Sequence, residues 1–435
     1  MTPEKFLERA RAEISDDPKS RLTLLARTMM EQPDCIIDVH THIFDKKCLS
    51  ISYILLRMAK ALGLKALGLE AVDKMKLLSK DEEQIYADIE AKEEDSDEDW
   101  EILEKELEQT IDLHETYELF GFNVKDGYKV LRKKNMKEVL DFYHDEFSIT
   151  KLPEFTNHKM VLGILQMDLE TGWGFKPKRN FRQQIRDIKE ISKTRAIIPY
   201  FAVDPRRAEK NGPEENLYEL FLEAFTDKHN PFFGVKCYPA LGYFPSDVRL
   251  DPIFQICAEK NIPVLTHCGG ESVSTFEKKI MIKNSTGYVH YEIPGDSRKL
   301  RARFLNEPDH WEPVLRKYNN LKLNLGHFGG GRPWKEFVED GNSQRLEKIF
   351  EFMRNPNFRV WGDFSYSIIE DDLFGLFKQV LDSNPEILKQ SLYGTDFWVV
   401  LPAGDLLKQQ EVFLEKLKDY KDPLLRDNVL DYLMN

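Results

Sequence analysis

The sequence predicts an α/β protein: a (β/α)8 TIM barrel with a helical insertion after strand 1 and a loop insertion after strand 5. Two observations carry this prediction. Eight short apolar or β-branched runs occur along the chain, and several are followed by a segment whose apolar residues recur at helical spacing. Near-continuous apolar strands are typical of a parallel sheet buried on both faces. Eight strand-helix units close a barrel, and an open doubly wound sheet is the alternative.

The eight predicted strands are separated by segments that leave room for crossover helices. They are 35–44, 159–167, 196–203, 232–238, 262–268, 321–328, 358–364 and 391–397. Helices are predicted from apolar spacing at 178–194, 216–225, 251–261, 333–354 and 371–388. Alternating strands and helices therefore extend from residue 35 almost to the end of the chain.

The domain organisation follows from the length of the chain. A typical complete barrel needs roughly 250 residues, so a chain of 435 residues must carry insertions. We predict an N-terminal helical segment over 1–34 and the barrel over 35–435, with 46–157 as a helical cap that has a solvated acidic face. A second insertion, 270–308, leaves the C-terminal end of strand 5 and is expected to lie over the mouth of the barrel.

Composition excludes several classes of protein. The formal net charge is -13, which argues against nucleic-acid binding because phosphate contacts need an excess of Lys and Arg. No apolar run of about 18 residues is present, so no membrane span is predicted. The five cysteines form no CxxC pair and indicate reduced thiols, with Cys237 and Cys268 in the core. We expect a cytoplasmic protein with a small-molecule substrate, and a homo-oligomer is left open.

The strongest local signal is the segment Asp38-Val39-His40-Thr41-His42 on the first predicted strand. Residues i and i+2 of a strand point to the same face. His40 and His42 are therefore expected to project together into the barrel and to present two imidazoles to one ion. An HxH pair alone is weak, because two packed or surface histidines would give the same pattern.

Four further predicted strands end in a residue that suits a metal site or acid-base chemistry. These are Lys236, His267, His327 and Asp396. Strand ends converge on one mouth of a barrel, so distant residues become neighbours. His and carboxylate ligands together favour a divalent metal, Zn2+ first, with Mn2+, Fe2+ or Co2+ as alternatives and one or two ions bound.

This order of residues resembles the amidohydrolase superfamily. The stretch GVKCYPALGYFP and the turn GHFGGG resemble its amidohydrolase-related family, sometimes called amidohydrolase 2, which includes hydrolases and non-oxidative decarboxylases. The resemblance implies four metal ligands. They are His40, His42, His267 and Asp396. It also implies that His327 is either a ligand of a second ion or the catalytic histidine.

The resemblance allows two interpretations of Lys236. Carboxylation by CO2 would turn it into a carbamate that bridges two ions, whereas the single-metal members of the superfamily lack that bridge. An unmodified ammonium has no lone pair for a metal, but it could hold an anionic substrate group through charge-assisted hydrogen bonds.

The function expected from the resemblance is a metal-dependent hydrolase that cleaves a C-N or C-O bond of a small molecule with metal-activated water. Asp396 would take the proton of that water and return it to the leaving group. The alternative enzyme is a metal-dependent non-oxidative decarboxylase of a small aromatic or unsaturated carboxylate. A binding or scaffold protein built on a retired barrel is the non-enzymatic alternative, and loss of ligands would mark it.

Further candidates surround this predicted centre. Arg206, Tyr238 and Tyr243 follow strands 3 and 4 and are predicted to contact substrate, since loops at strand ends carry function. Asp363 ends strand 7 and is predicted to orient a ligand imidazole. Asp38 is predicted to face the same side as His40 and to act likewise.

Overall fold

The computed structural model describes residues 1–48, 124–173, 177–270, 273–339, 341–401 and 404–435. Within these residues, eight parallel strands form one sheet in the order β1-β2-β3-β4-β5-β8-β9-β10. The strands are β1 (Cys35–Thr41), β2 (Lys159–Leu165), β3 (Ile197–Val203), β4 (Gly234–Cys237), β5 (Val264–His267), β8 (Lys322–Gly326), β9 (Arg359–Asp363) and β10 (Ser391–Leu392). Each of the eight predicted strands is found.

The two ends of the sheet meet through the segment that follows β10. The Val39 N–H donates to the carbonyl of Tyr393 over 3.2 Å, and the Asp396 N–H donates to the carbonyl of His40 over 2.7 Å. These bonds join the last strand to the first and nearly close the barrel. The predicted (β/α)8 barrel is confirmed.

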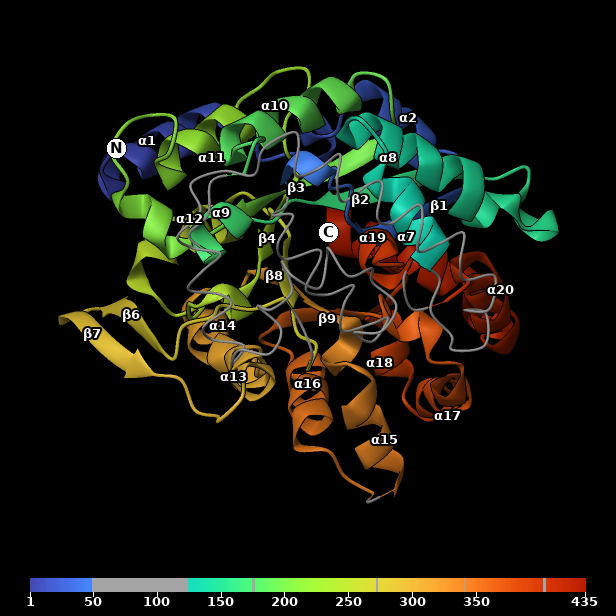
Figure 1. The fold of residues 1–435 in the computed structure, drawn as a ribbon. Coiled ribbons are helices and arrows are strands. Elements are labelled where there is room, and N and C mark those ends of the chain that lie inside the picture. Colours follow the sequence, from blue (N-terminus) through green and yellow to red (C-terminus); the bar gives the residue numbers. More distant parts are fainter. Residues whose placement is uncertain (49–123, 174–176, 271–272, 340, 402–403) are drawn as a thin grey trace, which may run out of the picture.

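Helices surround the strands on the outside (Figure 1). Those that follow barrel strands are α9 (Leu169–Trp173), α10 (Phe181–Ser192), α11 (Leu217–Phe225), α12 (Asp251–Glu259), α14 (Glu312–Lys317), α15 (Gly331–Glu339), α16 (Gln344–Arg354), α17 (Phe374–Ser383), α18 (Pro385–Lys389), α19 (Phe397–Val400) and α20 (Leu406–Lys416). The single helix predicted over 333–354 is two helices, α15 and α16. Gly341, between them, has a φ of 70°, which is incompatible with a continuous right-handed helix.

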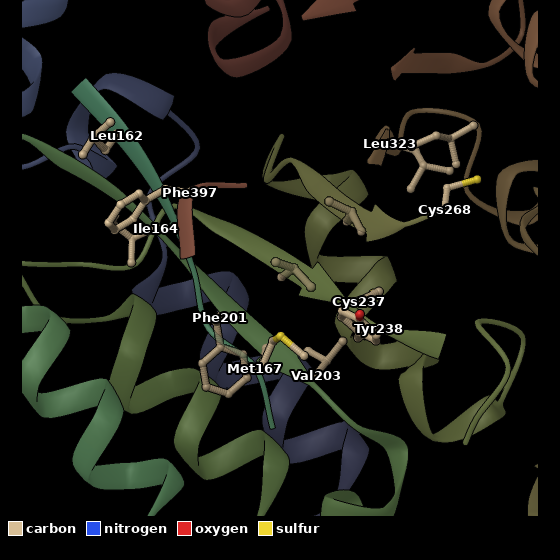
Figure 2. Packing of buried hydrophobic residues seen from close by; sticks show 14 of the residues in the cluster. Leu162, Ile164, Met167, Phe201, Val203, Cys237, Tyr238, Cys268, Leu323 and Phe397 are labelled. Atoms are coloured by element: carbon tan, nitrogen blue, oxygen red, sulfur yellow. The ribbon is translucent and has the colours of Figure 1, made fainter. Parts of the chain in front are cut away.

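The hydrophobic residues form two layers. One lies between strands and helices, and Figure 2 shows Phe201, Met167, Val203 and Cys237 within it. The other fills the barrel interior and includes Val39, Tyr200, Leu265, Trp361 and Leu392. Cys237 and Cys268 are buried in the outer layer, as predicted.

The N-terminal ends of the barrel strands are covered by the first and the last helices of the chain. Helices α1 (Pro3–Glu13) and α2 (Leu24–Met30) precede β1, and α21 (Asn428–Met434) ends the chain. The hydroxyl of Tyr432 donates to the carbonyl of Val264 over 3.1 Å, and Lys322 Nζ donates to the carbonyl of Leu433 over 3.0 Å. This end of the barrel is therefore closed by the terminal segments of the chain.

Strand β1 contains a β-bulge between Asp38 and Thr41, a stretch that includes the first histidine of the pair. Asp38 pairs with Leu162, but Thr41 pairs with Ile164, so three steps along β1 match two along β2. The extra residue reverses the alternation of side chains. Val39 still belongs to the interior layer, and the next residue, His40, also points into the barrel.

Gly163 of β2 makes room for this bulge. A Cβ atom at this position would lie 2.4 Å from the carbonyl oxygen of Val39, closer than any side chain can approach. The hydroxyl of Thr41 donates to the carbonyl of Gly163 over 2.7 Å and secures the bulged segment. The bulge therefore depends on a residue without a side chain on the neighbouring strand.

The two predicted insertions differ in how far the structure describes them. Of the predicted cap over 46–157, residues 49–123 lie outside the described part, and the remainder includes α7 (Val124–Leu131) and α8 (Met136–Phe142). The insertion after β5 is more ordered than the predicted loop. It forms the antiparallel hairpin of β6 (Lys279–Asn284) and β7 (Gly287–Glu292), followed by α13 (Arg298–Leu305).

The hairpin projects from the side of the molecule rather than across the barrel (Figure 1). Its inner face packs on Phe244, which follows β4, and the ring centroids of Phe244 and Tyr291 are 5.0 Å apart. The start of this insertion lies closer to the mouth, where the indole of Trp173 donates to the carbonyl of Ser274 over 3.1 Å. None of the described helices is both long and apolar enough to cross a bilayer.

Candidate metal centre

Three of the predicted ligands meet at the C-terminal end of the barrel. Asp396 Oδ1 lies 3.5 Å from His42 Nε2 and 3.8 Å from His40 Nε2, and the three donor atoms lie within 4.8 Å of one another. All three side chains are buried, with at most 3% of the residue exposed. Residues from the two ends of the barrel sequence thus face a common point.

The partners of His42 and His40 fix which ring nitrogen carries the proton. His42 Nδ1 lies 2.9 Å from the carbonyl oxygen of Leu165, which can only accept, so Nδ1 carries the hydrogen and Nε2 keeps a lone pair. His40 Nδ1 lies 3.1 Å from Asp363 Oδ2, and the same reasoning applies. Both histidines therefore turn a bare Nε2 toward Asp396, which is the form that binds a metal.

His327 and His267 are linked to each other. His327 Nδ1 lies 3.1 Å from the carbonyl oxygen of Ser365 and is a donor for the same reason. Its Nε2 accepts from His267 Nδ1 over 2.8 Å, which leaves His267 Nε2 with a lone pair. In this arrangement His267 faces His327 rather than the group of His40, His42 and Asp396.

The residues present fit a divalent cation. Asp396 Oδ1 and His267 Nε2 are both buried, and neither has a hydrogen-bond partner within the described residues. Buried polar atoms of folded proteins nearly always have a partner, and unpaired carboxylate oxygens are costly to bury. Imidazole and carboxylate donors are the ligands that Zn2+, Mn2+ and related ions prefer.

Burial sets the protonation of the centre. It lowers the pKa values of His40, His42 and His267 well below the usual range, and neighbouring positive charges act in the same direction. The rings are therefore neutral at physiological pH and able to act as ligands. Burial also raises the pKa of the Asp396 carboxyl well above its usual range, an effect that the charge of Lys236 opposes.

Lys236 reaches the same centre from β4. Its Nζ lies 3.5 Å from His40 Nε2 and 5.6 Å from the ring centroid of Tyr238. The side chain is 1% exposed, and burial lowers its pKa to about 8, against the opposing attraction of Asp396. Burial therefore makes this ammonium easier to deprotonate than that of an exposed lysine.

Asp363 joins several of these groups from the end of β9. Besides His40 Nδ1, its carboxylate accepts from the backbone N–H of His327 over 3.1 Å and from the side-chain amide of Asn324 over 2.8 Å. A carboxylate behind a ligand imidazole fixes the ring and makes it a better donor.

Two site residues hold strained backbone conformations. His327 has a φ of 66° and Asp396 a φ of 58°, a left-handed region that costs residues with a side chain free energy. Such strain tends to occur where the fold must aim a functional side chain. His327 directly follows β8, and Asp396 follows the short segment after β10.

The residues predicted to contact substrate have the following partners. The guanidinium of Arg206 forms an ion pair with Asp204 over 2.5 Å and donates to the carbonyl of Leu241 over 2.9 Å. The ring of Tyr238 stacks on that of His267, with centroids 4.4 Å apart. The hydroxyl of Tyr243, which is buried, accepts the N–H of Tyr238 over 2.6 Å.

The position of Asp38 differs from the prediction. Its carboxylate accepts from Thr395 Oγ1 over 2.6 Å and from the hydroxyl of Tyr143 over 3.3 Å, so it faces the outer layer rather than a ligand imidazole. The bulge in β1 explains this, because it places Asp38 and His40 on opposite faces.

Sequence reasoning missed Thr395 and Ser365. Thr395, which directly precedes Asp396, donates its hydroxyl to Asp38, and the Ser365 hydroxyl contacts two imidazoles. A lone hydroxyl residue after a strand carries no motif, so the sequence offered no signal beyond proximity to Asp363 and Asp396.

Several solved structures are similar to this chain. Amidohydrolase 2 from Bifidobacterium longum subsp. infantis has 10% identity over 92% of this chain and 99% of its own, with a TM-score of 0.41. A dihydroxybenzoic acid decarboxylase from Polaromonas sp. JS666, with manganese and 2-nitroresorcinol bound, has 14% identity over 72% and 89%, with a TM-score of 0.40. An uncharacterized TIM-barrel protein from Bordetella bronchiseptica has 17% identity over 57% and 71%, with a TM-score of 0.37.

No curated protein matches the chain. A family model described as Amidohydrolase matches residues 174–429. This span covers more than half of the chain and contains Lys236, His267, His327 and Asp396. The chain therefore belongs to the amidohydrolase family, a family of metal-dependent enzymes.

Proposed function

We propose that this protein is a metal-dependent hydrolase that cleaves a C-N or C-O bond of a small molecule. The observation that carries the proposal is the meeting of His40, His42 and Asp396, with the buried Asp396 Oδ1 left without a hydrogen-bond partner among the described residues. When bound there, a divalent cation supplies Lewis acidity, which polarises a carbonyl and makes water acidic enough to react near neutral pH.

Each side chain has a defined task in this proposal. His40 and His42 would hold the ion through Nε2, and His267 would be a further ligand. Asp396 accepts a proton from the attacking water and returns it to the leaving group.

His327 is proposed to be a catalytic residue. Its Nε2 would take part once it is no longer bonded to His267 Nδ1. That His327 nitrogen carries a lone pair and would then be free to accept a proton at the centre. At the mouth, Tyr238 and Arg206 are proposed to contact the substrate, and Tyr243 to support the backbone of Tyr238 through its hydroxyl.

We propose a single Zn2+ with an unmodified Lys236. The carbamate alternative would need a second ion bound by His327, but His327 Nδ1 is a hydrogen-bond donor to the carbonyl of Ser365, and its Nε2 accepts from His267 Nδ1. A protonated ring nitrogen has no lone pair for a metal.

The decarboxylase is the second candidate, and Lys236 is the observation that favours it. A buried lysine 3.5 Å from His40 Nε2 would hold a substrate carboxylate beside the centre by charge-assisted hydrogen bonding. The same residue would hold the anion formed from a carbonyl in a hydrolase.

Turnover of a small panel separates these proposals. Purified protein reconstituted with Zn2+ or Mn2+ should be assayed against lactones, amides and aromatic carboxylates, with release of CO2 followed separately. Hydrolysis without CO2 supports the first proposal, and CO2 from a carboxylate supports the second. Absence of bound metal from a folded protein supplied with either ion would contradict both.

A further inference from the structure

Ser365 lies at the centre of the hydrogen bonds behind the proposed metal site. It follows β9, two residues after Asp363, and is fully buried. Its hydroxyl contacts His40 Nδ1 over 2.9 Å and His327 Nδ1 over 3.0 Å, and it also contacts Asp363 Oδ1. One small side chain thus touches a proposed ligand, a proposed catalytic residue and the carboxylate between them.

The direction of each hydrogen bond follows from the partners. A carboxylate can only accept, so the Ser365 hydroxyl donates its single proton to Asp363. Its lone pairs are then left for the two imidazoles. Both rings must approach with N–H at Nδ1, which agrees with the tautomers that Asp363 requires of His40 and the Ser365 carbonyl requires of His327.

We infer that Ser365 is a positioning residue that fixes His40 and His327 together, with the Nε2 lone pair of His40 facing Asp396 and that of His327 facing His267. The two rings lie with centroids 4.7 Å apart, and rotation of either ring by 180° would replace an N–H donor at the hydroxyl with a C–H. The hydrogen bonds to Ser365 therefore oppose the ring flip that would turn Nε2 away from Asp396 or His267.

The same hydrogen bonds around Ser365 argue against a second ion at this place. His40, His327 and Asp363 each offer an atom within 4.8 Å of the others, a spacing that would suit a cation. Two of those atoms are the Nδ1 donors directed at Ser365 and Asp363, so the cluster is satisfied by hydrogen bonds instead.

The surroundings of Ser365 restrict this position to a small side chain. A Cβ on Gly394 would lie 2.8 Å from His40 Cβ and 3.1 Å from Ser365 Cβ, so this part of the interior has no spare volume. Ser365→Ala removes the hydroxyl and adds no atom. The variant is thus expected to keep the positions of the surrounding side chains while losing the hydrogen bonds of the Ser365 hydroxyl.

The tautomers can be measured without any substitution at Ser365. In metal-free wild-type protein with 15N-labelled histidine, two-bond 1H-15N spectra should show His40 and His327 protonated at Nδ1. The signals are assigned with variants that each lack one histidine. Protonation of either ring at Nε2 would overturn the inference. This measurement needs neither metal nor turnover.

The consequence for the metal site can be measured by competition with a chromogenic chelator. Ser365→Ala should bind Zn2+ about 10- to 100-fold more weakly, the range usual for loss of a group that orients a ligand, and its Co2+ complex should have an altered visible spectrum. Ser391→Ala is the matched control, because Ser391 is equally buried but donates to the carbonyl of Ile387 over 2.8 Å.

The outcomes separate this inference from the proposed function on which it rests. Wild-type affinity and an unchanged Co2+ spectrum in Ser365→Ala would overturn the positioning role. Wild-type protein that binds no Zn2+ would contradict the proposed function, whereas protonation of His40 or His327 at Nε2 would overturn the role of Ser365 without touching that function.

Discussion

The imidazole of His40 has contacts on both sides of its ring. Nδ1 faces Asp363 and Ser365, and Nε2 faces Asp396 and Lys236. A side chain held in this way loses little conformational entropy when it binds an ion, because its orientation is already fixed by the fold.

Asp396 is the residue whose substitution tests the metal site most directly. Asp396→Asn keeps the shape but removes the anionic donor, so we expect metal affinity to fall at least about 100-fold and turnover to be lost. The fold should persist, since Asp396 contributes to the barrel through its backbone N–H. Metal content and the melting temperature measure the two effects.

An exposed carboxylate provides the control for this variant. Asp372 pairs only with Lys335 among its charged neighbours in the described chain, so Asp372→Asn should bind metal like wild type. Full metal content in Asp396→Asn would exclude Asp396 as a ligand.

Asp38 allows a test by pH at the same scale. Burial raises its pKa to about 7, and hydrogen bonds from Thr395 and His40 oppose this effect. The folded state therefore holds the proton more tightly than the unfolded state, so the contribution of this carboxyl to stability falls as pH rises from about 4 to about 7. Asp38→Asn should remove this dependence, as seen in unfolding free energies measured across that range.

At the scale of elements, the bulge in β1 decides which residues face the centre. Without it, strict alternation would place Val39 and Thr41 inside and turn the histidine pair toward the outer helices. The bulge depends on Gly163 because of the close approach of the Val39 carbonyl.

Gly163→Ala should therefore damage both the fold and the site. The added methyl group must displace the backbone of β1, at a cost of about 1–3 kcal/mol in unfolding free energy, and the movement should lower metal affinity. Thermal melting and chelator competition measure these effects.

Gly375→Ala in α17 is the matched control for this variant. Its new Cβ would meet only Lys416, at 3.7 Å, and alanine favours a helix over glycine. Equal stability of Gly163→Ala and wild type would show that the bulge in β1 does not depend on Gly163.

At the scale of the whole molecule, the two ends of the barrel have separate roles. The N-terminal end is filled by α2, α21 and the interior layer, and the C-terminal end carries the candidate metal centre. Loops can therefore vary at one end while the other end maintains stability, which is the usual division of labour in this fold.

Lys322 provides a test of the closed end. It is buried, and burial together with the charge of Arg359 lowers its pKa to about 6. The unfolded chain then binds more protons than the folded one above that pH, so the contribution of Lys322 to stability rises with pH and is lost as pH falls through about 6.

Lys322→Met should remove this dependence. We expect the variant to gain stability relative to wild type at low pH, as measured by denaturant unfolding at several pH values. Lys317→Met, at an exposed lysine, is the control. The same pH slope in wild type and Lys322→Met would contradict the assignment of a neutral, buried Lys322.

Much of the fold and part of the site could be predicted from the sequence. The eight strands were found because a sheet buried on both faces demands continuous apolar runs, and the strand ends then identified His40, His42 and Asp396 as neighbours. The break between α15 and α16 was missed because it depends on the backbone angle of Gly341 rather than on apolar spacing. The hairpin after β5 was missed because half of the residues in β6 and β7 are polar or glycine, unlike the continuous apolar runs of the barrel strands.

The sequence by itself determined which residue types stand at the strand ends and the order in which they occur, since local apolar patterns specify strands and helices. Only the tertiary structure decided which faces these residues present. The side of the barrel reached by His40 and Asp38 depends on the bulge opposite Gly163, and the tautomers of the histidines depend on Asp363 and Ser365. Both follow from contacts between strands far apart in the chain, which no local pattern encodes.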